Sequence, residues 1–73
     1  MNAAQLIRSM ERYECQSTTA PDARATIRDE RLALAAAVHP DRAYESAADR
    51  AAHIGQVLAE ARRVCAMWGV IHA

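Results

Sequence analysis

A four-residue segment, His39-Pro40-Asp41-Arg42, is the part of the sequence best suited to recognition chemistry. It places an imidazole, a carboxylate and a guanidinium side by side. Proline disfavours a helical conformation in the residue before it and has no backbone N–H, so a helix arriving from the N-terminal side should end at about His39. The segment is therefore predicted to form an exposed bend, where binding groups are usually carried.

Other reactive side chains lack the spacing of a catalytic or metal site. The candidates for zinc binding are His39, His53, His72, Cys15 and Cys65. No combination of them has a spacing known for zinc. The sequence contains no nucleophile motif, phosphate-binding glycine loop or HExxH motif, and its acidic residues are scattered. We therefore expect no enzyme activity, no metal and no cofactor.

Composition restricts the classes of partner. The chain has 73 residues and a formal net charge of +0, and all of its basic residues are arginines. A neutral chain lacks the general electrostatic attraction that binds nucleic acid or anionic lipid, so we expect neither nucleic acid nor membrane as a partner. The two cysteines belong to no CxxC pair and no hydrophobic run reaches transmembrane length. These features predict a cytoplasmic protein with one domain over residues 1–73.

Three helices are predicted, at about residues 2–15, 21–38 and 46–68. Asn2 is suited to cap the first helix, and Pro21 is suited to the first turn of the second. Ser46 followed by an aspartate three residues later resembles a capping box for the third. Gly69 is suited to end that helix. The fold class expected is all-α, with the last two helices forming an antiparallel hairpin.

The third helix carries the strongest periodic signal. Its apolar positions recur at alternating spacings of four and three residues: Ala47, Ala51, Ile54, Leu58, Ala61, Cys65 and Trp68. Such a seam can pack within the domain or join two chains as a coiled coil. In a three-helix chain the first interpretation is favoured. Both a monomer and a homodimer remain open.

A second surface feature accompanies the bend. Arg24, Arg28 and Arg31 follow one another in the second helix at spacings of four and three residues, which places them on one face. The ordinary interpretation of such a stripe is a solvated helix face.

Several short matches surround the bend. His39-Pro40-Asp41 lies between two amphipathic helices that we expect to be antiparallel, and Arg42 follows it. Tyr13-Glu14, Ile27-Arg28 and Leu34-Ala35 precede it without a gap at positions where a known family has its aromatic segment, its "IR" pair and its "LA" pair. This pattern resembles the J domain of DnaJ-type co-chaperones over about residues 13–64.

The resemblance implies that the chain binds a DnaK-type chaperone ATPase and stimulates its ATP hydrolysis. In that family the aspartate of the turn engages an arginine of the chaperone, and a basic helix docks on an acidic surface. The residues implied in partner binding are His39, Pro40, Asp41, Arg42 and Arg28, with Arg31 and Arg24 added by geometry alone.

The second helix departs from the family pattern. Arg31 lies where the family tends to have an aromatic residue, and Ala33 and Ala37 lie near positions that are commonly basic. The alternative function is therefore a small helical adaptor or inhibitor, of phage or mobile-element origin, that binds another host protein with the same surface. DNA binding through a helix-turn-helix is disfavoured by the neutral charge and by Pro40 in the connecting turn.

Overall fold

The computed structural model describes residues 1–71, and that part of the chain contains three α-helices and no strand. α1 spans Ala3–Cys15, α2 spans Pro21–Val38 and α3 spans Ala47–Met67. Each helix begins and ends within one residue of the range expected from the sequence. The prediction of an all-α, three-helix fold is confirmed.

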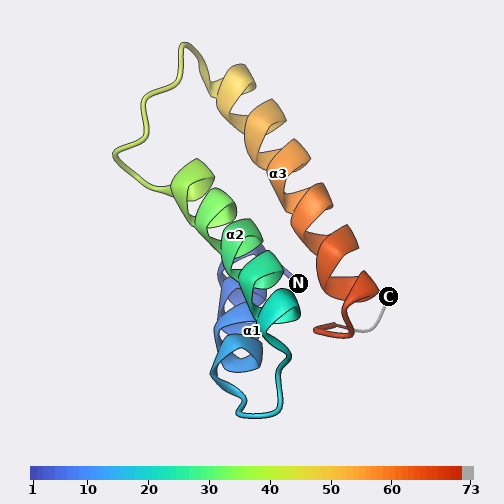
Figure 1. Ribbon diagram of the computed structural model, residues 1–73. Helices are drawn as coiled ribbons and strands as arrows, with labels where there is room; N and C mark the ends of the chain where they lie inside the picture. The colour runs from blue at the N-terminus through green and yellow to red at the C-terminus, as the bar shows by residue number, and fades with distance from the viewer. Residues whose placement is uncertain (72–73) are drawn as a thin grey trace.

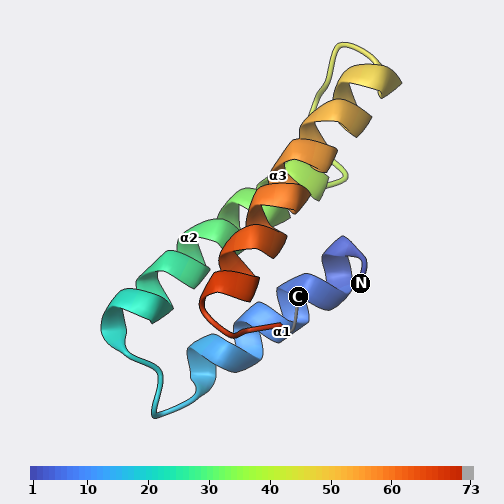
Figure 2. The ribbon, with the colours of Figure 1, turned by 90° about the vertical axis from the view of Figure 1, so that its right-hand side faces the viewer.

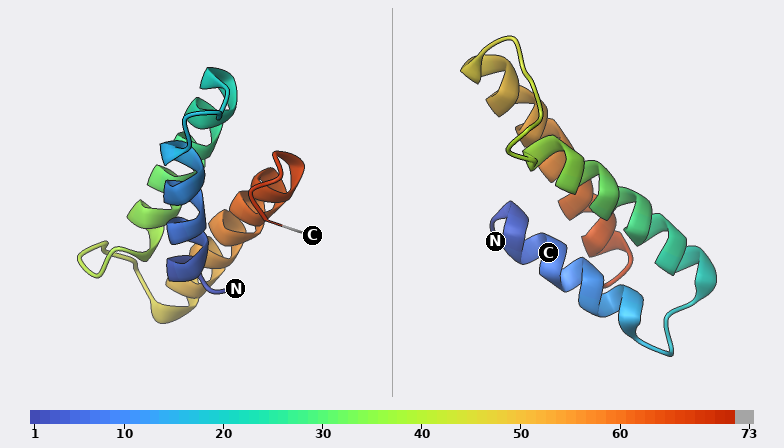
Figure 3. Two further views of the ribbon diagram at one scale, coloured as in Figure 1. Left: turned by 90° about the horizontal axis from the view of Figure 1, so that it is seen from below. Right: turned by 90° about the vertical axis from the view of Figure 1, so that its left-hand side faces the viewer.

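In the view of Figure 1, α1 runs down, α2 runs up and α3 runs down again, along an elongated molecule that measures 42 × 23 × 18 Å. α2 packs against both other helices, whereas the contact between α1 and α3 is slight. As Figures 2 and 3 show, α1 covers only one end of the α2–α3 hairpin. The loop that carries the bend lies at the opposite end. The fold therefore presents this loop away from the body of the domain.

The helix ends are set by local sequence. The side chain of Asn2 accepts a hydrogen bond from the Gln5 amide at 2.9 Å, and the Gln5 side chain accepts one from the Asn2 amide at 2.8 Å, which completes a capping box. Pro21 is the first residue of α2, and Ser46 Oγ accepts a hydrogen bond from the amide of Asp49. These expected caps are confirmed.

A glycine ends the third helix. Gly69 adopts a φ of +76°, in the left-handed region that residues with a Cβ avoid. The amide of the next residue, Val70, donates to the Cys65 carbonyl at 2.8 Å, as in a Schellman-type helix end. His72 lies outside the described residues.

The core lies where all three helices meet. Its buried side chains are Leu6 and Met10 of α1, Ile27 and Leu34 of α2, and Ala61, Val64 and Cys65 of α3. Burial raises the pKa of the Cys65 thiol to about 11, and the charge of Glu30 contributes to the same shift. This thiol is therefore protonated and acts as a small apolar side chain. Cys15, in contrast, is exposed.

The first part of the expected α3 seam is not in this core. Ala47 and Ala51 are exposed, and Ile54 is only half-buried. The reason is that α1 does not reach this end of the hairpin, so the apolar stripe of α3 has only α2 to pack against. Trp68 lies beyond the other end of the helix and is 40 % exposed.

Some large apolar side chains remain on the surface. Leu32 is 53 % exposed, and Met1 and Met67 are more exposed still. Within residues 1–71, no helix combines the length and the apolar character needed to cross a membrane.

Candidate functional site

The bend after α2 forms a compact turn. The carbonyl of His39 accepts a hydrogen bond from the amide of Arg42 at 3.0 Å, and its ring Nδ1 accepts one from the amide of Asp41 at 3.1 Å. Because Nδ1 accepts, the neutral ring carries its hydrogen on Nε2. His39 itself has extended backbone dihedral angles, as expected before Pro40. The imidazole therefore stabilises the turn from within.

The Asp41 carboxylate is available to a partner. Asp41 is exposed, and no group in residues 1–71 forms a hydrogen bond or an ion pair with its side chain. Its backbone is held by the His39 ring and by the proline before it. A carboxylate presented in this way binds a cation with little further ordering cost.

A shallow apolar hollow lies beside the turn. Its volume is about 500 Å³, and its lining residues are Leu32, Ala35, Ala36, His39, Asp41 and Arg42. Leu32, Ala35 and Ala36 form its apolar floor on α2, while the turn supplies the polar rim. The site thus combines a hydrophobic contact with one free anion and one cation.

The two best-matched arginines remain near the surface. The guanidinium carbon of Arg42 lies 5.2 Å from the centre of the Tyr44 ring, a cation–π contact. Arg28 pairs with its neighbour Asp29 at 3.1 Å, but the two side chains are 54 % and 70 % exposed. Exposed pairs of this kind contribute little, so Arg28 can exchange Asp29 for a partner at small cost.

The other two arginines of the stripe are engaged within the chain. Arg31 forms a two-point ion pair with Glu14 of α1, with Nε–Oε2 and Nη2–Oε1 distances of 2.6 and 3.0 Å. The hydrogen bond that the guanidinium donates to this carboxylate raises the pKa of Arg31. Arg24 donates to the carbonyls of Gln16 and Thr19 in the α1–α2 loop. The structure therefore does not bring these two residues together with the turn.

Arg31→Ala is expected to lower the free energy of unfolding by about 1.5–3 kcal/mol, the usual contribution of hydrogen bonds to charged groups. The substitution leaves the Glu14 carboxylate, whose side chain is only 12 % exposed, without its partner. Urea unfolding followed by circular dichroism measures the change.

The matched control for this substitution is Arg28→Ala on the same helix. Its exposed ion pair should change the stability by less than about 0.5 kcal/mol. Equal losses in the two variants would show that the Arg31–Glu14 pair does not hold α1 against α2.

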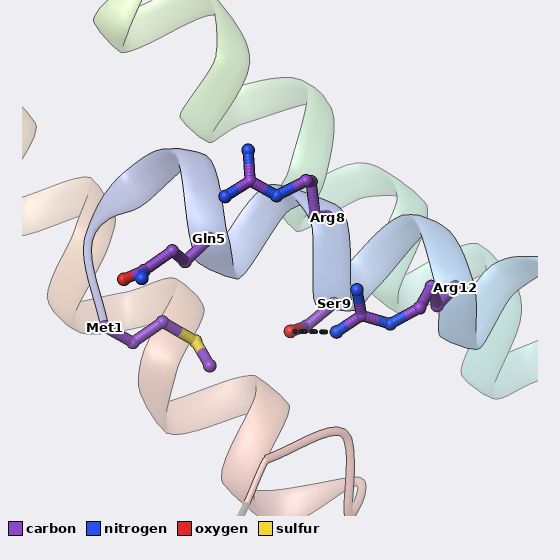
Figure 4. Close-up of a pocket in the computed structure, with 5 residues that line it drawn as sticks. All are labelled: Met1, Gln5, Arg8, Ser9 and Arg12. Atoms are coloured by element: carbon purple, nitrogen blue, oxygen red, sulfur yellow. Dashed lines mark hydrogen bonds between the residues drawn. The ribbon is translucent and has the colours of Figure 1, made fainter.

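Two other hollows lie away from the turn. One lies on α1, has a volume of about 410 Å³ and is lined by Met1, Gln5, Arg8, Ser9 and Arg12. Figure 4 shows Arg12 directed toward Ser9, whose hydroxyl accepts a hydrogen bond at 3.1 Å. The other hollow, of about 330 Å³, lies between α2 and α3 and is lined by Glu30, Ala33, His53, Gln56, Val57 and Glu60.

The acidic hollow between α2 and α3 does not assemble a metal site. Burial raises the pKa of Glu30, and repulsion from Glu60 adds to that effect. In the described part of the chain, no group of three or more His, Cys, Asp or Glu side chains is arranged to hold a metal ion.

Two residues of the site were missed by reasoning from the sequence. Leu32 is out of phase with the buried positions Ile27 and Leu34, and this mismatch could have marked it as a surface contact. Nothing in the local sequence distinguishes Tyr44 from a residue that packs at the edge of the domain. Its hydroxyl contacts the carbonyl of Ala37 and the ring of His53, and these partners are set by the path of the loop.

Comparisons of the chain with protein-family models, curated protein sequences and solved structures found no match. The fold and the site therefore define the class of this protein. It is a small three-helix protein that presents an exposed His-Pro-Asp turn beside an apolar hollow.

Proposed function

We propose that this chain is a J-domain-like interaction module that binds a DnaK-type chaperone and stimulates its ATPase. The observation that carries the proposal is the free carboxylate of Asp41, held on a proline turn at the exposed tip of a helical hairpin. A cation on the partner would pair with this carboxylate. The proposed place of action is the cytoplasm.

The surroundings of Asp41 suit such a contact. The apolar floor of the hollow would take an aliphatic side chain of the chaperone, because Leu32 is exposed and has no covering side chain. Arg28 and Arg42 would guide the approach to an acidic surface, since complementary charge accelerates encounter more than it adds affinity. Arg24 and Arg31 are bonded within the domain, so we do not include them in the proposed contact.

The direct test is the effect of the protein on a purified DnaK-type chaperone. Single-turnover ATP hydrolysis should accelerate as the protein is added, and the acceleration should saturate. Surface plasmon resonance with the chaperone in its ATP state should show binding in the same concentration range. A protein that neither accelerates hydrolysis nor binds would exclude the co-chaperone function.

A second candidate is a small helical adaptor or inhibitor that binds another host protein. It is favoured by one observation: α2 exposes the apolar residues Leu32 and Ala36 beside the turn. Affinity capture with the native chain and with Leu32→Asp as matched baits tests it. A single host protein retained by the first bait and lost by the second would support this function, whereas equal capture by both would contradict it.

A further inference from the structure

A tyrosine ties the turn to both helices of the hairpin. The hydroxyl of Tyr44, in the loop between α2 and α3, lies 2.8 Å from the carbonyl oxygen of Ala37 near the end of α2. The same hydroxyl lies 2.8 Å from Nδ1 of His53 on α3. The tyrosine side chain is half-buried between them. One oxygen atom thus joins the loop, the end of α2 and the first half of α3.

The number of hydrogens available fixes the direction of both bonds. A tyrosine hydroxyl has one hydrogen, and the carbonyl of Ala37 can only accept. The hydroxyl therefore donates to Ala37 and accepts from His53. This arrangement requires a hydrogen on Nδ1 of His53, so a neutral ring must be in the Nδ1–H form. That form is the opposite of the one required of His39.

Two arginines pack against the ring of the same tyrosine. The guanidinium carbons of Arg42 and Arg50 lie over the Tyr44 ring, at 5.2 and 5.7 Å from its centre. Arg50 of α3 also approaches the carbonyl of Val38, with an Nη2–O distance of 3.4 Å. The last carbonyls of a helix have no partner within it. Here the carbonyls of Ala37 and Val38 accept from side chains of the loop and of α3.

We propose that Tyr44 is a positioning residue for the turn, because its hydroxyl, held between the Ala37 carbonyl and Nδ1 of His53, fixes the path of the loop that presents Asp41. The structural part of this inference stands alone, and its consequence for stimulation rests on the proposed function. Without the hydrogen bond between the Tyr44 hydroxyl and His53, the loop between the helices, residues 39–46, is no longer joined to α3 through this hydroxyl. Asp41 would then sample orientations that do not fit a partner.

Nuclear magnetic resonance tests the structural part without any partner. At about pH 9, where imidazole side chains are neutral, the ¹⁵N shifts of His53 should be those of the Nδ1–H form. In Tyr44→Phe the ring and its arginine contacts remain but the hydroxyl is lost. The amide order parameter of Asp41 should then fall from about 0.85 to below about 0.6.

Two further variants give matched comparisons. Tyr13→Phe removes the hydroxyl of the other tyrosine, which packs against the core, and should leave the order parameter of Asp41 unchanged. His53→Asn keeps an N–H donor near the position of Nδ1 and should preserve the order, whereas His53→Leu should not. A His53 ring in the Nε2–H form, or an Asp41 amide equally ordered in Tyr44→Phe, would overturn the proposal.

Chaperone stimulation tests the consequence. If the turn has the binding orientation in only a fraction of the molecules, the protein concentration that gives half-maximal stimulation rises in inverse proportion to that fraction. Tyr44→Phe should raise it about fivefold, with the maximal acceleration unchanged, and His53→Asn should retain the native value. An unchanged concentration with a disordered Asp41 would show that Tyr44 orders the turn without positioning it for the chaperone. A wild-type protein without stimulation would instead refute the proposed function, and the order parameters would still decide the role of Tyr44.

Discussion

Asp41→Asn is expected to abolish the acceleration of ATP hydrolysis by a DnaK-type chaperone and to leave the melting temperature unchanged. Asparagine has almost the same shape, and the carboxylate that it replaces forms no described contact within the chain. The loss would therefore arise only where the carboxylate meets a cation of the partner. Removing one member of a close, hydrogen-bonded charge pair at an interface costs about 2–5 kcal/mol, which corresponds to at least about a 30-fold loss of affinity.

The control for this variant is Glu45→Gln. Glu45 is also an exposed carboxylate on the loop, and it does not line the hollow beside the turn. It gives the same change of net charge without touching the candidate site, so stimulation should persist. If both variants lost the same activity, general charge would be responsible. If Asp41→Asn stimulated normally, the turn would not be the group that the chaperone recognises.

Leu34→Asp is expected to prevent folding. Leu34 is fully buried in the cluster that α1, α2 and α3 build together. A carboxylate at this position would be buried without a partner, at a cost of several kcal/mol. A domain of this size has little stability to lose, because small chains bury a smaller fraction of their surface than larger ones. Circular dichroism should show loss of helix and of the cooperative thermal transition.

Leu32→Asp, the same substitution two residues earlier in α2, is the matched control. Leu32 is 53 % exposed, so Leu32→Asp should change the free energy of unfolding by no more than about 0.5 kcal/mol. Both variants replace a leucine of α2 by the same charge, and only the burial differs. Equal melting curves for the two would contradict the helix orientation described above. Such a result would place Leu34 on a surface.

Substitutions in α3 should follow the same distinction. A charge at Leu58, which packs against the core from a half-buried position, should destabilise the domain less than one at Leu34. At the exposed Ala51 it should do almost nothing. If the apolar seam predicted from the sequence formed one continuous core, charges at Leu58 and Ala51 would both destabilise the domain strongly.

The helices could be derived from local sequence alone. Asn2, Pro21 and Ser46 begin them, and Gly69 ends the last. Each of these signals acts within about one helical turn, through a cap or a backbone restriction. The bend at His39 was predictable for the same reason. Proline restricts the residue before it whatever the rest of the chain does.

Which residues make up the site depends on contacts between positions that are far apart in the sequence. Arg31 is separated from Glu14 by 17 positions, and the crossing of α1 and α2 decides that the two meet. The sequence alone placed Arg31 on a stripe with Arg28. The structure turns Arg31 toward α1 and leaves Arg28 exposed. The position of α1 therefore gives two arginines on one face of α2 different environments.

By itself, the sequence determined three helices, their ends and an exposed turn with a histidine, a proline and an aspartate. Only the tertiary structure decided that α1 stops short of the turn, that Leu32 lies beside Asp41, and that Tyr44 reaches His53. The physical reason is the range of the interactions. Caps and periodicity act over a few residues, whereas the hollow and the tyrosine bond exist only where packed helices bring distant positions together.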